Sequence, residues 1–219
     1  MARGLPNSCS EVQKLERARY DGEFYLHVHG KILKVYCRDM ETTRPTEYIT
    51  LASGDGRNYA EIYQKSLFNP NQCPHNGSRN SSCLCHDKGH PDAGYTVYEK
   101  VRINLDTMQI SVSDMQFSRT VQGKAVPFGN AGDCYSTARC PQGAFNIDLS
   151  GTGLGVSPDT QWHTQGRFIT ADINRSQGIF MTADIHRSQD GSVVQGRCGG
   201  YCGTCFPNPV SGLRVRFLR

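Results

Sequence analysis

The sequence has no long apolar segment and no dense block of positive charge. No run of about 18 apolar residues occurs, so we expect no membrane span. With 24 Lys and Arg against 20 Asp and Glu, the net charge is only +4, which disfavours a nucleic-acid partner but remains compatible with sulfated glycans. The first six residues, Met1 to Pro6, lack the apolar stretch of a signal peptide.

Catalytic motifs of secreted enzymes are also missing. The zinc-protease signature H-E-x-x-H is absent, and the nearest match, His86-Asp-Lys-Gly-His90, lacks the Glu and lies among Gly and Pro residues that disfavour a helix. No G-x-S-x-G motif occurs, and the even cysteine count leaves no obvious free thiol nucleophile. We therefore expect no catalytic residue, no metal ligand and no cofactor in this chain.

Cysteine is abundant and spread from end to end. The ten residues are Cys9, Cys37, Cys73, Cys83, Cys85, Cys134, Cys140, Cys198, Cys202 and Cys205. Ten cysteines predict five disulfides in an oxidising compartment. Spacing does not fix the pairing, although Cys134 and Cys140 are weakly favoured as a local pair.

Two cysteine segments also admit other interpretations. Cys83-Leu-Cys85-His86 and Cys202-Gly-Thr-Cys205 offer zinc ligands, but a closed zinc site needs paired knuckles at matched spacing. Cys202 and Cys205 also have the spacing of a redox dithiol, but Gly and Pro residues surround them and favour a structural disulfide. A disulfide-rich chain without its own signal peptide is expected to be a fragment, an expressed domain or the tail of a longer precursor.

Three N-x-S/T sequons support secretion. They predict glycosylation of Asn76, Asn80 and Asn174. The first two lie in the segment Asn69–Gly94, a polar stretch with Pro, Gly and three cysteines that is expected to form an exposed loop.

The N-terminal part predicts one short helix followed by a hairpin. Ser8 and Glu11 have the spacing of a capping box, so a helix is expected over Glu11–Arg19. Aromatic and β-branched residues then predict strands over Glu23–His29 and Lys31–Cys37, turning at Gly30. In the first strand Phe, Leu and Val alternate with Tyr and His, which predicts one apolar and one polar face.

Short strands and turns dominate the rest, in keeping with 23 Gly and 10 Pro. Strands are expected at Glu47–Leu51, Tyr95–Leu105, Met108–Phe117, Ala144–Leu149, Ser192–Gln195 and Leu213–Leu218, with Tyr59–Tyr63 extended or forming one helical turn. Tyr95–Leu105 and Met108–Phe117 are expected to form a second hairpin. Thr170–Gln177 recurs as Thr182–Gln189, and this twelve-residue period predicts a β-meander. The fold class is therefore all-β, mainly antiparallel, with one short N-terminal helix in a single disulfide-stabilised domain.

Two side-chain groups carry alternative hypotheses of binding. His27 and His29 share a strand face and would chelate zinc if His163 or His186 approached, although a solvated face is the favoured interpretation. Arg214 and Arg216 also share a strand face and offer a contact for sulfated glycans, although protection of a sheet edge is favoured.

Several long, irregular motifs resemble one known family. They are Cys9–Gln13, Asp21–Tyr25 leading to Lys34–Cys37, Arg102–Ile110, Val126–Phe128, Ala131–Tyr135, Cys140–Gly143 and Cys198–Cys202. Over Cys9 to Leu218 the chain resembles the GON domain, the C-terminal module of one subgroup of the ADAMTS secreted zinc metalloproteases. We assign residues 9–219 to this domain and residues 1–8 to a linker or expression remnant.

The resemblance implies an ancillary role outside the catalytic domain. The parent protease would cleave extracellular-matrix proteoglycans through a zinc site in another domain, while this module binds substrate or matrix or assists secretory trafficking. The leading hypothesis is thus a secreted, non-catalytic domain whose partners are matrix proteins, proteoglycans or sulfated glycans. The alternative hypothesis is an independent secreted metal- or glycan-binding protein.

Overall fold

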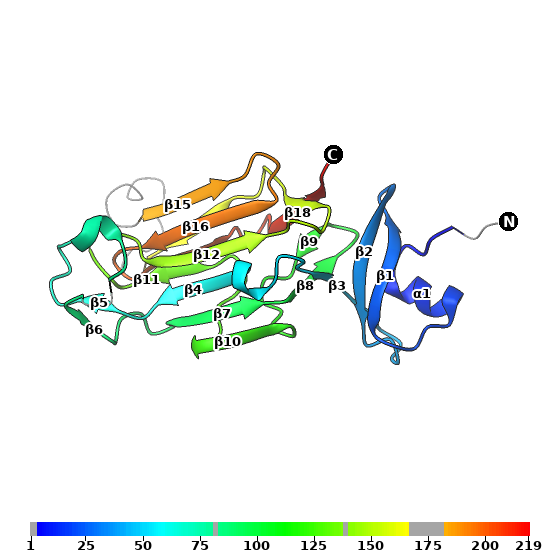
Figure 1. Ribbon diagram of the computed structural model, residues 1–219, viewed down its shortest axis with the longest axis horizontal. Helices are drawn as coiled ribbons and strands as arrows, with labels where there is room; N and C mark the ends of the chain where they lie inside the picture. Colours follow the sequence, from blue (N-terminus) through cyan, green and yellow to red (C-terminus); the bar gives the residue numbers. More distant parts are fainter. Residues whose placement is uncertain (1–3, 81–82, 138–139, 167–181) are drawn as a thin grey trace.

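The computed structural model describes residues 4–80, 83–137, 140–166 and 182–219. The molecule is elongated, with the N-terminal helix and hairpin at one end and cysteine-rich loops at the other (Figure 1). Its elements are α1 (Cys9–Glu16), β1 (Gly22–Val28), β2 (Lys31–Arg38), β3 (Thr46–Thr50), η1 (Asp55–Arg57), β4 (Tyr59–Tyr63), β5 (Ser66–Leu67), η2 (Pro74–Gly77), β6 (Cys85–His86), β7 (Gly94–Tyr98), β8 (Lys100–Asn104), β9 (Gln109–Ile110), β10 (Ser118–Gly123), β11 (Ala131–Asp133), β12 (Gly143–Asp148), β13 (Leu154–Val156), β14 (Trp162–Gln165), β15 (Thr182–Arg187), β16 (Val193–Gly199), β17 (Gly203–Pro207) and β18 (Leu213–Phe217).

Two large sheets share one apolar core. One has seven strands in the order β1-β2-β3-β8-β9-β18-β13. The other has nine, with the main path β14-β17-β11-β4-β12-β16-β15, with β7 pairing with β4, and with β10 pairing with β7. Among the described strands every pairing is antiparallel except that of β11 with β4. Side chains from both sheets, such as Leu33 and Phe145, belong to one continuous buried cluster. The expected all-β, antiparallel fold class is confirmed.

The N-terminal helix and hairpin form as the sequence predicts, with shifted boundaries. Ser8 caps α1 through its side-chain oxygen, which accepts from Glu11 N at 3.1 Å. The helix ends three residues before the expected Arg19 because Arg17 adopts a left-handed conformation with φ 55°. Residues 6–8 take part in the fold, since the Pro6 carbonyl accepts from the backbone N–H of His27.

The first hairpin turns at two residues with positive φ. His29 has φ 48° and Gly30 has φ 80°, and two such residues form the tight turn whose twist matches that of the strands. The predicted alternation is confirmed, because Leu26 and Val28 are buried while the intervening His27 is exposed.

The second expected hairpin is confirmed only near its turn, where β8 pairs antiparallel with β9, and is wrong for the rest of the two segments. Tyr95–Leu105 is split at Glu99 into β7 and β8, which belong to different sheets. Within Met108–Phe117 only β9 is a strand, and β9 pairs with β8 and β18. The backbone groups of Glu99 stay hydrogen-bonded at this split, because Glu99 N donates to Phe117 O and Leu51 N donates to Glu99 O. The chain can therefore cross between the sheets without leaving these groups unpaired.

The cysteines form five disulfides, all of them between described residues. The pairs are Cys9–Cys37, Cys73–Cys140, Cys83–Cys85, Cys134–Cys202 and Cys198–Cys205. The expected local pair of Cys134 with Cys140 is therefore wrong, and Cys202 does not pair with Cys205. Both departures arise because β11, β16 and β17 meet in one sheet and bring distant cysteines together.

The internal repeat is described only in its second copy. Thr170–Gln177 lies outside the described residues, while residues 182–187 of the second copy form β15, which pairs with β16. No helix within the four described ranges is long and apolar enough to cross a membrane.

Candidate functional site

A buried carboxylate, Asp133, organises the cysteine-rich end. Its Oδ1 accepts from the backbone N–H groups of Tyr135 and Gly200, both at 3.0 Å. Its Oδ2 accepts from the N–H groups of Gln142 at 2.5 Å and Gly143 at 3.2 Å. Burial raises the pKa of Asp133 and outweighs the opposing effect of these four bonds. The side chain therefore joins three chain segments at one point.

Disulfides and glycines complete the surroundings of Asp133. Cys134 and Cys202 follow Asp133 and Tyr201 directly in the chain and are bonded to each other. A Cβ atom at Gly199 would overlap the Asp133 carboxylate, and one at Gly143 would overlap the backbone of β11. Several motifs that carry the family resemblance thus meet here. The close packing explains why these motifs contain Gly at positions 143 and 199 and Asp at position 133.

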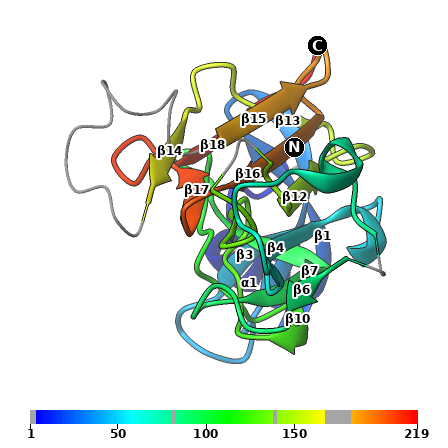
Figure 2. The same cartoon turned by 90° about the vertical axis from the view of Figure 1, so that its left-hand side faces the viewer.

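Arg79 fixes the neighbouring loop to the sheet. Its guanidinium carbon lies 4.1 Å from the ring centroid of Tyr63, and it forms an ion pair with Glu61. The side chain also donates to the Gln142 carbonyl. These contacts and the Cys73–Cys140 disulfide hold the loop that carries the first two sequons, which lies nearest the viewer in Figure 2.

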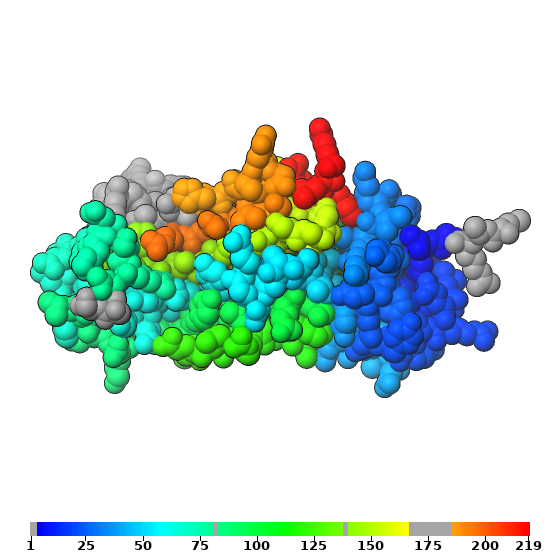
Figure 3. Space-filling view, in the orientation of Figure 1, coloured from blue at the N-terminus to red at the C-terminus, as the bar shows by residue number. Residues whose placement is uncertain are grey.

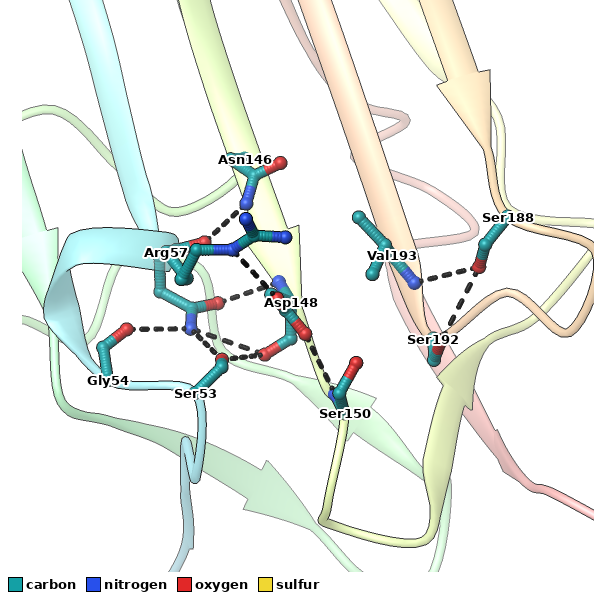
Figure 4. Close-up of polar contacts among 10 residues, drawn as sticks. Ser53, Gly54, Arg57, Asn146, Asp148, Ser150, Ser188, Ser192 and Val193 are labelled. Carbon is teal, nitrogen blue, oxygen red and sulfur yellow. Dashed lines mark hydrogen bonds and ion pairs between the residues drawn. The ribbon is translucent and has the colours of Figure 1, made fainter.

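A second polar network lies on the outer face of the nine-stranded sheet (Figure 4). Asn58 is fully buried, and its Nδ2 donates to the Ser53 hydroxyl at 3.0 Å and to the carbonyls of Gly54 and Asp148 at 3.0 and 3.2 Å. The Asp148 N–H donates back to Asn58 Oδ1 at 2.8 Å. Asn58 therefore ties the turn before β4 to the end of β12.

Asp148 adds an ion pair to this network. Its Oδ2 lies 3.1 Å from Nε of Arg57. Burial alone would raise the pKa of Asp148, but hydrogen bonds from Ser150 and the charge of Arg57 lower it. Figure 3 shows the strands around this network, β16, β12 and β4, as adjoining bands on one open face. The network stabilises a turn and leaves the surrounding sheet face accessible.

A polar groove of about 570 Å³ lies at the opposite end, beside α1. Its lining includes His27, His29, Glu47, Arg102 and Asp106. Burial raises the pKa of Glu47, partly opposed by the N–H of Cys9 and the charge of Arg102. The groove carries both signs of charge, so it suits a polar partner rather than a purely anionic one.

The histidine pair is placed in this groove without a third ligand. His29 Nε2 donates to the Leu105 carbonyl at 2.8 Å, which occupies one of its two ring nitrogens. His163 and His186 lie on β14 and β15 of the other sheet. Across the described part of the chain, no three His, Cys, Asp or Glu residues gather closely enough to hold a metal ion.

The remaining predicted residues are scattered over the surface. Asn76 is exposed in η2 and Asn80 is half-buried, while Asn174 lies outside the described residues. Arg214 and Arg216 are exposed on the same face of β18, as the sequence pattern indicated. The structure therefore brings the sequons of one loop together but does not unite them with the arginines.

Sequence reasoning missed the three polar residues that organise these regions. Asp133 lies within the motif Ala131–Tyr135, in which the sequence predicted a role only for Cys134. Asn58 lies between η1 and β4, and Arg79 lies between the sequons of Asn76 and Asn80. A signal existed only for Asp133, where Gly-Asp-Cys in an apolar strand indicates a buried carboxylate that needs backbone donors.

This combination of two sheets, dispersed disulfides and buried polar braces defines a class, the disulfide-stabilised all-β domain. Within that class the chain belongs to the GON domain family, whose model matches residues 6–217. No solved structure matches the chain.

The curated relatives are much longer proteins. The chain is 47% identical to human "A disintegrin and metalloproteinase with thrombospondin motifs 20" over 96% of the chain and 10% of that protein. The mouse protein of the same name is 46% identical over 98% of the chain and 10% of its own length. The Caenorhabditis elegans protein "A disintegrin and metalloproteinase with thrombospondin motifs gon-1" is 37% identical over 95% of the chain and 9% of its length. The chain thus spans about a tenth of these relatives.

Proposed function

We propose that the chain is a non-catalytic ancillary domain of a secreted zinc metalloprotease of the ADAMTS family. One observation carries this: the chain matches only about a tenth of relatives that are named as metalloproteinases. Its buried carboxylates, Asp133 and Asp148, bond to backbone groups and an arginine that hold the fold together. The catalytic zinc would then be held elsewhere in the longer protein.

The domain acts through its surface on extracellular-matrix proteins or proteoglycans. The groove beside α1 supports this role, because its mixed charges on a rigid scaffold suit polar recognition. Disulfides throughout the chain support a secreted location. Glycans on Asn76, Asn80 and Asn174 fit the same location, and each would be detected as a mass loss on enzymatic deglycosylation.

Deleting residues 6–217 from the full-length protease tests this function. We expect cleavage of a short soluble peptide to be unchanged, while the fraction of secreted enzyme retained on cell-derived matrix falls. A matched control replaces Asp92 with Asn at an exposed ion pair and should retain matrix binding. Equal retention with and without the domain would remove the matrix role. A lower secreted amount with an unchanged matrix-bound fraction would instead support the role in secretory trafficking.

A second candidate function is binding of sulfated glycans through β18. The exposed Arg214 and Arg216 lie on one face of that strand, which supports this candidate. Replacing both with Gln should lower the salt concentration needed for elution from heparin, because contacts between exposed charges are screened by salt. Arg119→Gln is the control, since Arg119 is 67% exposed on β10. Elution of the unaltered domain together with a neutral protein would exclude this candidate.

A further inference from the structure

The disulfide between Cys83 and Cys85 differs from the other four in the loop it closes. Its cysteines are separated by two positions, whereas the remaining separations are 7, 28, 67 and 68. A disulfide stabilises a fold mainly by restricting the unfolded chain, and this restriction grows with loop length. The bond between Cys83 and Cys85 encloses only Leu84, so the fold gains little from keeping it closed.

This bond also lies where another molecule can reach it. Cys83 and Cys85 are half-buried, and Leu84 between them is 78% exposed. The cysteines of the Cys9–Cys37 and Cys198–Cys205 pairs are 0% exposed. Because thiol–disulfide exchange requires access to a sulfur atom, these two buried pairs are protected. The other two pairs are partly accessible, since Cys73 is exposed and Cys134 and Cys202 are half-buried, but their separations of 67 and 68 positions make them far more costly to open than Cys83–Cys85.

Opening the bond leaves its surroundings anchored. Residue 85 belongs to the short β5–β6 ladder, opposite Leu67, and Phe68 N donates to Leu84 O at 3.0 Å. The adjoining loop keeps the Arg79 contacts and the Cys73–Cys140 disulfide. The two sulfur atoms are not equivalent, because Cys85 packs against the small cluster of Leu67, Tyr135 and Cys140 while Cys83 is outside it.

We propose that Cys83–Cys85 is an exchangeable disulfide that captures a thiol from another molecule. The incoming thiolate attacks Sγ of Cys83 and forms a mixed disulfide there. The bond between Cys83 and Cys85 breaks, and its electron pair leaves on Sγ of Cys85, which takes up a proton. One thiol and one disulfide are present before and after the step, so no oxidant or reductant is needed. The ligand is a cysteine thiol, from a small thiol or from a protein.

Graded exposure of the oxidised full chain to reduced glutathione tests the proposal. After each step, free thiols are alkylated and the cysteines are mapped by peptide mass spectrometry. We expect glutathione on Cys83 and the alkyl group on Cys85 at a thiol concentration at least tenfold below that which opens any other pair. The proposal would be overturned if Cys134–Cys202 opened at a lower glutathione concentration than Cys83–Cys85. It would also be overturned if the peptide map showed Cys83 bonded to a cysteine other than Cys85.

Two single substitutions separate the two sulfur atoms. Cys85→Ser leaves Cys83 free and should form adducts with oxidised glutathione, whereas Cys83→Ser should form at least tenfold fewer. All ten cysteines of the unaltered chain are in disulfides, so a second copy has no thiol to offer and the thiol comes from a small molecule or from a different protein. Equal reactivity of the two variants, with unchanged melting temperatures, would contradict the assignment of Cys83 as the attacked residue.

Discussion

The two ends of the molecule are stabilised in different ways. At the N-terminal end, α1, β1 and β2 are regular elements that pack apolar side chains and need one disulfide, Cys9–Cys37. At the opposite end, short strands and loops depend on the other four disulfides and on the buried Asp133 (Figure 1). Where the backbone is too irregular to bond to itself, the buried Asp133 carboxylate accepts from its N–H groups, and the disulfides restrict the chain covalently.

The largest expected effect comes from removing the Asp133 carboxylate. Asp133→Ala leaves four backbone N–H groups without their acceptor, and we expect a loss of at least about 4 kcal/mol in the free energy of unfolding. Denaturant unfolding and the secreted yield would measure it. The control Asp92→Ala removes a carboxylate that is 63% exposed and should change stability by about 0.5 kcal/mol or less. Similar losses in both variants would mean that burial does not distinguish the two carboxylates.

Removing disulfides one pair at a time compares long and short loops at the same end. Replacing Cys73 and Cys140 with Ala should cost about 4 kcal/mol, because their bond closes a 67-residue separation. Replacing Cys83 and Cys85 should cost only about 1.5 kcal/mol, because their separation is two. Thermal unfolding of both variants under non-reducing conditions measures the difference. If the short loop proved the more costly to lose, chain restriction would not explain the disulfides here.

A single glycine tests the regular end. Gly30 has φ +80° in the first hairpin turn and open space around it, so Gly30→Ala should cost about 1 kcal/mol through backbone conformation alone. Gly56→Ala is the matched control, since no atom lies within 4 Å of its added Cβ and its φ is not in the left-handed region. Chemical denaturation should place this control within about 0.5 kcal/mol of the unaltered chain. A neutral Gly30→Ala would show that the turn tolerates a side chain.

The contrast between the two ends also explains what the sequence could predict. The alternation around Leu26 and the capping pair Ser8 and Glu11 are local patterns, and they predicted the N-terminal hairpin and helix. Local patterns failed where the chain crosses between sheets at Glu99 and where Cys134 reaches Cys202. These features depend on contacts between segments about 20 to 70 residues apart. The functional site has the same limit, because one donor to Asp133, the N–H of Gly200, lies 67 residues away in the sequence.

A second carboxylate separates the effect of burial from that of hydrogen bonding. Asp190, in the turn between β15 and β16, accepts from the backbone N–H and hydroxyl of Ser192 and from the hydroxyl of Ser188. These bonds lower the pKa of Asp190 from 3.8 to about 2 in an exposed setting. Burial raises the pKa of Asp133 despite its four N–H donors. The same kind of bond thus accompanies opposite shifts, and between Asp133 and Asp190 burial decides the direction.

The two shifts predict opposite dependences on pH. The folded-state pKa of Asp190 lies below the unfolded value of 3.8. Its contribution to stability is therefore present above pH 3.8 and is lost as the pH falls toward about 2. For Asp133 the folded value is raised, so its contribution is present at low pH and falls as the pH rises through that value. Carboxyl-carbon NMR titration should give a midpoint of about 2 for Asp190, returning toward 3.8 when Ser188 and Ser192 are both replaced by Ala. A midpoint that stays at about 2 in this double variant would exclude hydrogen bonding as the cause of the low pKa of Asp190. Asp190 would then no longer be a valid reference for Asp133.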